Sequence, residues 1–124
     1  MPSTLEIGQK LVEHCQTQTE REALNTLYHP DAVSVEAHVP EGMDPVTTGI
    51  DGIHGKHDWW DANFEVHGGS VDGPYVNGDV FSVIFEIDAT EKATGQRMPM
   101  KEVALYHVKD GKIVREEFQM KPMG

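Results

Sequence analysis

The spacing of apolar residues predicts two short helices at the start of the chain. Ser3-Thr4-Leu5-Glu6 has the form of a capping box, and an apolar stripe at helical spacing follows it, formed by Gly8, Leu11, Val12 and Cys15. The segment 19–22 repeats the capping form before a second stripe, which runs from Ala23 to Tyr28. We therefore expect helices over about 4–16 and 20–28, because Pro30 cannot continue a helix.

The pattern then changes to a strand, a loop and a third helix. Residues 32–37 mix β-branched and small side chains, which predicts a strand. The segment 38–48 contains two prolines and a glycine, and we interpret it as a long loop. A helix over about 50–64 is expected next, with one face formed by Ile53, His57, Trp60 and Phe64.

The second half of the chain reads as a strand meander. Glycines interrupt the segment 66–75 and predict a bent strand, and Asn77-Gly78 is a two-residue hairpin signal. Strands are expected over 80–90, 98–108 and 113–120. The order α-α-β-α-β-β-β-β predicts an α+β fold, in which three N-terminal helices pack on a curved, mainly antiparallel sheet. We expect a single domain over 1–124.

Composition limits the partners of this chain. The 124 residues carry a formal net charge of −11, which argues against binding to nucleic acid or to anionic membranes. No apolar run is long enough to span a membrane, no secretion signal is present, and no glycine-rich phosphate loop occurs. Cys15 is the only cysteine and cannot form an internal disulfide, which favours a cytoplasmic location.

Glu36 is the first candidate catalytic residue. Strand alternation places it on one face with Ser34 and His38, opposite Val33 and Val35. If the valines face the helices, Glu36 lies in solvent; the opposite arrangement buries it and raises its pKa toward the range of a general base. His38 would then orient the base or join it as a metal ligand. No histidine pair has the His-x-x-x-His spacing of a helical zinc site, so we expect no metal.

Two later strands supply further candidates. Glu102 and Tyr106 share one strand face, which suits a polar pair in a cavity or an ordinary half-exposed sheet. Phe81 and Phe85 lie on the apolar face of the strand before it. Residues 115–117 are expected to be solvated charges, although Glu117 has the alternative of reaching into the fold.

Three segments resemble a known family. They are residues 27–33 (LYHPDAV) after two helices, 49–55 (GIDGIHG) at the start of the third helix and 108–114 (VKDGKIV) in the last hairpin. The chain resembles the SnoaL-like branch of the NTF2-like superfamily, which includes the ketosteroid isomerases. The resemblance implies a cone, in which the sheet wraps around three helices and encloses an apolar cavity, and a homodimer formed through the outer face of the sheet.

The same resemblance implies a role for Glu36. Ketosteroid isomerases carry their general base on the strand that follows the corresponding Tyr, and an ungapped comparison places that base at Glu36. Those enzymes also use a Tyr of the first helix and a neutral Asp of a late strand. Here the first helix has His14 and Cys15 in that region, and the late strand has no Asp between Glu102 and Tyr106. The isomerase reaction itself is therefore not carried over.

We expect a small apolar molecule to bind inside the cone, with Trp60, Phe64, His57, Phe81 and Phe85 around it. The enzymatic interpretation is cofactor-free acid–base chemistry on a carbonyl compound: isomerisation, cyclisation or dehydration. Glu36 would act as the base, Glu102 would contribute an acid or base, and Tyr106 or His38 would stabilise an enolate-like oxygen. Two alternatives remain at this point: a non-catalytic ligand-binding protein, and a dimeric structural domain that fills its own cone.

Overall fold

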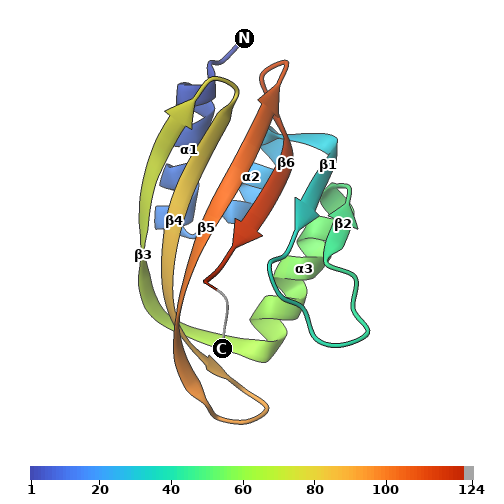
Figure 1. Ribbon diagram of the computed structural model, residues 1–124, viewed down its shortest axis with the longest axis vertical. Helices are drawn as coiled ribbons and strands as arrows, with labels where there is room; N and C mark the ends of the chain where they lie inside the picture. Colours follow the sequence, from blue (N-terminus) through green and yellow to red (C-terminus); the bar gives the residue numbers. More distant parts are fainter. Residues whose placement is uncertain (122–124) are drawn as a thin grey trace.

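The computed structural model describes residues 1–121 as three helices packed on one face of a curved sheet (Figure 1). The helices are α1 (Thr4–Thr17), α2 (Glu20–Leu27) and α3 (Ile50–Asn63). The strands are β1 (Tyr28–Val35), β2 (Val46–Thr48), β3 (Phe64–Asn77), β4 (Val80–Glu91), β5 (Arg97–Lys109) and β6 (Lys112–Gln119). The predicted α+β class is confirmed.

The sheet has six strands in the order β2-β1-β6-β5-β4-β3. All neighbours are antiparallel except β1 and β6, which run parallel, so the prediction of a mainly antiparallel sheet is also confirmed. The parallel pair joins the first strand to the last one. Because of this pairing, Ser34 lies beside Glu116 and Val35 beside Glu117, although 82 positions of sequence separate the members of each pair.

The predicted element order was wrong in one respect, because it lacked β2. This short strand pairs antiparallel with β1 inside the segment that we interpreted as a loop. The prolines and glycine around β2 are typical of a loop, but pairing with β1 makes its three residues a strand. β1 also begins earlier than predicted, at Tyr28, and its register with β6 shifts between Tyr28 and Val33. Pro30 lies in this interval and has no N–H to donate to the ladder.

The ends of the first two helices show which capping signals act. Ser3 forms the predicted capping box: its hydroxyl accepts from the Glu6 N–H at 3.1 Å, and the Glu6 carboxylate accepts from the Ser3 N–H at 3.2 Å. Thr19 precedes α2 without a side-chain cap. Its hydroxyl instead lies 2.7 Å from Nδ1 of His14, which ties α2 to the end of α1.

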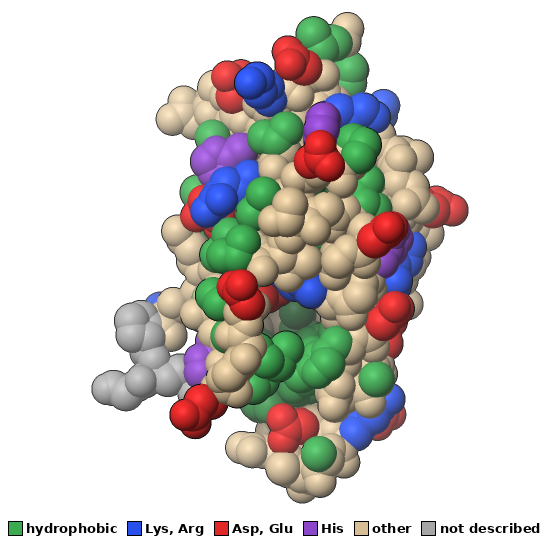
Figure 2. Space-filling model, turned by 90° about the vertical axis from the view of Figure 1, so that its right-hand side faces the viewer, with side chains coloured by type: hydrophobic (Ala, Val, Ile, Leu, Met, Phe, Trp, Pro, Cys, Tyr) green, Lys and Arg blue, Asp and Glu red, His purple; other side chains and the backbone are tan. Residues whose placement is uncertain are grey.

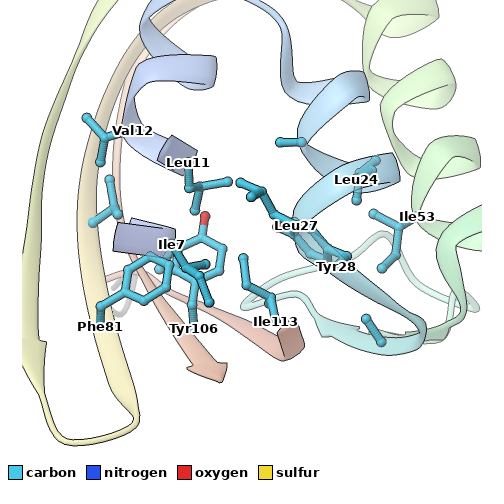
Figure 3. Close-up of a cluster of buried hydrophobic side chains, with 14 residues drawn as sticks. Ile7, Leu11, Val12, Leu24, Leu27, Tyr28, Ile53, Phe81, Tyr106 and Ile113 are labelled. Carbon is cyan, nitrogen blue, oxygen red and sulfur yellow. The ribbon is translucent and has the colours of Figure 1, made fainter. Parts of the chain in front are cut away.

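The hydrophobic core lies between the helices and the inner face of the sheet (Figure 3). Helices supply Ile7, Leu11, Val12, Ala23, Leu24, Leu27 and Ile53, and strands supply Tyr28, Ala32, Phe81, Val83, Ala104, Tyr106 and Ile113. Gly8 allows α1 to approach the sheet closely, because a Cβ there would lie 2.8 Å from Cβ of Pro74 and 3.2 Å from the Phe81 ring. Of the helices that the structure describes, none has the length and apolar character of a membrane span.

Candidate active site

The strand register decides which way Glu36 points. Ser34 has no exposed surface and pairs in register with Glu116, which in turn pairs with the core residue Tyr106. Ser34 therefore faces the interior. The Glu36 N–H donates to the Pro45 carbonyl at 2.9 Å, which continues the extended pairing beyond the end of β1. By alternation, Glu36 shares the interior face with Ser34, while Val33 and Val35 lie on the outer face.

Lys56 of α3 reaches across to the same face of β1. Its Nζ lies 2.6 Å from Oε1 of Glu36 and donates to Oγ of Ser34, also at 2.6 Å. The ammonium also lies 5.5 Å from the centroid of the Phe118 ring, within the range of a cation–π contact. The Lys56 side chain is 22% exposed and that of Glu36 is 32% exposed, so the ion pair is half-buried.

Glu116 is a buried carboxyl on the neighbouring strand β6, with 5% of its surface exposed. The Tyr28 hydroxyl donates to its Oε2 at 2.7 Å. Burial raises the pKa of Glu116, and hydrogen bonds from the Tyr28 and Ser34 hydroxyls oppose that rise. We had expected residues 115–117 to be solvated, and for Glu116 this was wrong.

A bulge explains the error at Glu116. The register between β5 and β6 shifts between the His107–Arg115 pair and the Val108–Ile113 pair. The extra residue reverses the alternation along β6, so Glu116 turns inward. Glu117 lies on the outer face instead, where its Oε1 accepts from Nε of Arg115 at 2.6 Å.

Glu102 of β5 is the third carboxyl on the interior face. Its pKa is raised to about 7, first by burial and then by the charges of Glu36 and Glu116, while Lys56 acts in the opposite direction. We call Glu36, Glu102 and Glu116 the interior carboxyl cluster. A carboxyl with a pKa near 7 is about half ionised at neutral pH, so it both accepts and donates protons.

The Glu102 carboxyl is available to a ligand. It makes no hydrogen bond or ion pair to a side chain within residues 1–121. In that same part of the chain, no buried side-chain polar atom lacks a partner. The Glu102 oxygens are therefore not sealed in the core and touch space that water can reach.

A hollow is visible on the side of the molecule that carries β1, β2 and α3 (Figure 2). Hydrophobic side chains form its walls, and basic and acidic side chains lie at its upper margin. Two shallow depressions of about 370 and 390 Å³ lie elsewhere, one beside Ile87 and Met100 and the other beside His29 and Lys112. Neither includes a member of the interior carboxyl cluster.

Of the predicted site residues on β4 and β5, Phe81 and Tyr106 lie in the core, and Phe85 lies beside Glu102. Phe81 has no exposed surface and stacks on Tyr106 with ring centroids 4.8 Å apart, so both rings belong to the core. The Tyr106 hydroxyl points into the gap between Leu11 and Leu27 (Figure 3). Burial raises the pKa of Tyr106 well above its usual value, so its hydroxyl stays protonated. Phe85 is half-buried and lies directly beside Glu102 in the sheet.

Of the aromatic residues predicted on the third helix, Trp60 lies near the C-terminal end of α3 and Phe64 is the first residue of β3. Trp60 and Phe64 stack with centroids 4.2 Å apart and an interplanar angle of 12°. His57 is half-buried, and burial together with the Arg21 charge lowers its pKa. His38 lies in the segment between β1 and β2 with an exposed side chain, and forms no side-chain hydrogen bond or ion pair with residues 1–121.

Comparison with known proteins identifies the family. The SnoaL-like domain model matches residues 2–120. This chain belongs to the SnoaL-like family. A solved structure from Mesorhizobium loti, described as a candidate SnoaL-like polyketide cyclase, is 43% identical, with a TM-score of 0.89 over 95% of this chain and 99% of that one. A search of curated proteins found no significant match.

More distant structures share the NTF2-like fold of this SnoaL-like domain. A candidate isomerase from Bacillus subtilis has a TM-score of 0.74 at 19% identity and covers 98% of this chain and 91% of its own. A protein from Catenulispora acidiphila with a ketosteroid isomerase-like fold was crystallised with trimethylamine. It has a TM-score of 0.71 at 22% identity, over 96% of this chain and 88% of its own. At these identities the likeness establishes the fold alone.

Sequence reasoning missed Lys56, Ser34 and Glu116 in this SnoaL-like domain. Lys56 lies three positions after the core residue Ile53, which places it on the inner side of α3, and this spacing was a usable signal. Ser34 lies two residues before Glu36 and therefore on the same strand face, so its place beside Glu36 was also predictable. Glu116 was not, because the bulge that turns it inward has no mark in the local sequence.

The ionisable groups of this interior are three carboxyls and one ammonium. Within the described part of the chain, no three His, Cys, Asp or Glu side chains come together as a metal-binding group. Burial raises the pKa of Cys15 to about 12, so its thiol is not ionised and is a poor nucleophile. The interior carboxyl cluster and Lys56 remain as the groups able to move or stabilise charge.

Proposed function

We propose that this protein binds a small, largely apolar carbonyl compound inside its cone and catalyses cofactor-free proton transfer on it. Isomerisation, cyclisation and dehydration all belong to this class. One observation carries the proposal: Glu36, Glu102, Glu116 and Lys56 come from different elements and face one interior. Burying that many ionisable groups costs stability, and such groups concentrate where chemistry or binding uses them.

Glu102 is the proton carrier in this proposal. In its ionised form, the carboxylate removes a proton from the carbon next to the carbonyl. The C–H electron pair then forms a carbon–carbon double bond, and the carbonyl π electrons move to the oxygen. The protonated Glu102 returns the same proton to another carbon or to a leaving oxygen. A pKa of about 7 suits both halves of this cycle near neutral pH.

Glu36 acts in this proposal through its charge. Its ion pair with Lys56 at 2.6 Å requires the carboxylate form. The negative charge then disfavours ionisation of Glu102, since two neighbouring carboxylates repel. We therefore move the role of base from Glu36, where sequence reasoning placed it, to Glu102, and propose that Glu36 holds the pKa of Glu102 near neutrality. His38 remains a proposed ligand contact, whereas Tyr106 packs in the core against Phe81 and takes no part in the proposed step.

The relatives support the reaction class. The M. loti protein at 43% identity is described as a candidate polyketide cyclase, and cyclisation of a polyketide begins with proton removal beside a carbonyl. We propose cyclisation of an apolar polycarbonyl compound as one specific form of the activity. The walls of the hollow favour such a ligand, because apolar surface buried in them contributes about 25 cal/mol per Å² to binding.

Hydrogen–deuterium exchange tests the proposal without knowledge of the natural substrate. The protein is incubated in D2O with cyclic ketones that carry or lack a fused aromatic ring, and loss of the proton beside the carbonyl is followed by NMR. We expect exchange above the buffer rate for at least one ketone. The rate should rise with pH through about 7 and then level, because only the ionised form of Glu102 removes a proton. A rate equal to that of buffer at every pH contradicts the proposal.

A second candidate is binding of a small molecule without turnover. The C. acidiphila structure with trimethylamine shows that one protein of this fold holds a small ligand. Aromatic residues and carboxylates together would suit an organic cation in this chain as well. Tight binding of trimethylammonium compounds combined with no ketone exchange would favour this candidate.

We also propose a homodimer formed through the outer face of the sheet. Half-buried apolar side chains of β1 and β5, the two strands that flank β6, lie on that face, namely Val33, Val35, Val103 and Leu105. A second copy would remove them from water. Sedimentation equilibrium should give twice the mass of 13.8 kDa, and a monomer mass at micromolar concentration contradicts the dimer.

A further inference from the structure

We propose that Lys56 binds the carbonyl oxygen of the ligand and stabilises the negative charge that forms on it. This inference rests on the proposed function and specifies its substrate class: compounds whose reacting carbonyl becomes an enolate beside the Lys56 ammonium.

The contacts of Lys56 leave it able to take this role. An ammonium group has three N–H donors. Among the groups of residues 1–121, the Glu36 carboxylate and the Ser34 hydroxyl lie within hydrogen-bonding distance, at 2.6 Å each. One donor therefore remains for a ligand. Lys56 is also the positive charge that opposes the raised pKa of Glu102, so the ammonium and this carboxyl influence each other electrostatically.

Lys56 and Glu102 together complete the proton-transfer step. As the Glu102 carboxylate takes the proton from carbon, the carbonyl oxygen gains the displaced electron pair and becomes an enolate oxygen. The hydrogen bond from the Lys56 ammonium to this oxygen strengthens as negative charge forms on the oxygen. It therefore stabilises the transition state more than the bound ketone. The proton returns from Glu102 and the electron pair returns to carbon, so the step needs no other reactant.

Buried groups behind Lys56 hold it in place. Ser34 accepts from Lys56, and its own hydroxyl proton is directed to the Glu116 carboxyl, which also accepts from Tyr28 at 2.7 Å. Ser34 has no exposed surface, Tyr28 is 6% exposed and Glu116 is 5% exposed. These hydrogen bonds fix the direction of the Lys56 ammonium, and we regard Ser34 and Glu116 as positioning residues.

Binding of 4-nitrophenol tests this inference without any turnover. Its phenolate is a stable mimic of an enolate, and its absorbance reports whether the bound probe is ionised. At pH 6 we expect the wild-type protein to bind the probe and to raise its phenolate fraction. We expect Lys56→Met to weaken binding at least about tenfold and to leave the bound probe as the neutral phenol. Lys56→Arg should retain part of the phenolate signal, because it keeps the charge.

The charged groups around the probe predict how its binding depends on pH. Glu36, just after β1, Glu102 of β5 and Glu116 of β6 share the interior face with Lys56, and the Tyr28 hydroxyl donates to Glu116. When affinity is expressed for the phenolate form alone, it should fall as pH rises through about 7, because Glu102 becomes negative and repels the phenolate. Lys56→Met should give no signal of bound phenolate across this pH range.

Matched variants separate this inference from folding effects and from the proposed function. Lys101→Met removes a lysine of β5 whose side chain is 63% exposed and lies beside Glu86. This variant should bind the probe as the wild type does. Ser34→Ala keeps the Lys56 charge but removes one anchor, and should lower the phenolate fraction even if Lys56→Met fails to fold. A wild-type protein that binds no phenolate, or a Lys56→Met variant that binds it equally well, overturns the inference. Ketone exchange in the wild-type protein is judged separately and decides the proposed function.

Discussion

Glu102→Gln is expected to lower the rate of ketone deuterium exchange at least about a hundredfold, which is the usual contribution of a general base. Glutamine has nearly the same shape as glutamate but accepts no proton in this pH range. Burial and the charges of Glu36 and Glu116 bring the pKa of Glu102 to about 7, which makes it the group in the interior best matched to neutral pH. Affinity for the ketone should change little, because the loss concerns the transition state.

Glu86→Gln is the matched control for this variant. Glu86 belongs to the adjacent strand β4, and its side chain is 59% exposed beside Lys101. It is the same change of residue type, made outside the interior. We expect its exchange rate to stay within about twofold of the wild-type rate, since Glu86 lies on the opposite face of the sheet and its exposed charge is screened by water. Equal rates for Glu102→Gln and wild type would remove Glu102 from the mechanism.

Phe81→Ala is expected to have the largest effect on stability, a loss of about 3–5 kcal/mol in the free energy of unfolding. The ring has no exposed surface, stacks on Tyr106 at 4.8 Å and lies against α1 at Gly8. Its removal leaves a cavity that rigid neighbours on both sides cannot fill. Urea unfolding followed by circular dichroism measures the change.

Tyr75→Ala provides the comparison for Phe81→Ala. Tyr75 is an aromatic residue of the adjacent strand β3, and 53% of its surface is exposed. We expect its replacement to cost less than about 1 kcal/mol, because little apolar surface is buried there. A loss for Phe81→Ala as small as the one expected for Tyr75→Ala would contradict a packed environment around the Phe81 ring.

Local patterns predicted the helices and most strands because each has a clear periodic signal. A few neighbouring residues are enough to predict these elements, as in the capping box at Ser3, the apolar stripe through Leu11 and the turn at Asn77-Gly78. β2 has no such signal. Its three residues form a strand because β1 lies beside them, and a pairing of this kind is invisible in one segment alone.

The candidate site was predictable in part for the same reason. Alternation placed Glu36 with Ser34 and Glu102 with Tyr106, and both pairs share a face in the structure. Sequence could not choose the face, because Val33 and Val35 suited either side. It also failed at Glu116, whose direction depends on a register shift between two strands. Ionisable residues near bulges are therefore the ones for which strand parity is least informative.

Titration of the glutamate carboxyls by carbon-13 NMR tests the central claim most directly, that Glu36, Glu102 and Glu116 turn into one shielded interior. Resonances are assigned by comparing the wild-type protein with Glu102→Gln. The account predicts one carboxyl with a midpoint near 7, absent from Glu102→Gln and moved toward lower pH in Glu36→Gln, where the neighbouring negative charge is removed. If every glutamate of the wild-type protein titrates near the ordinary value of about 4.3, the carboxyls lie in water and the account is contradicted.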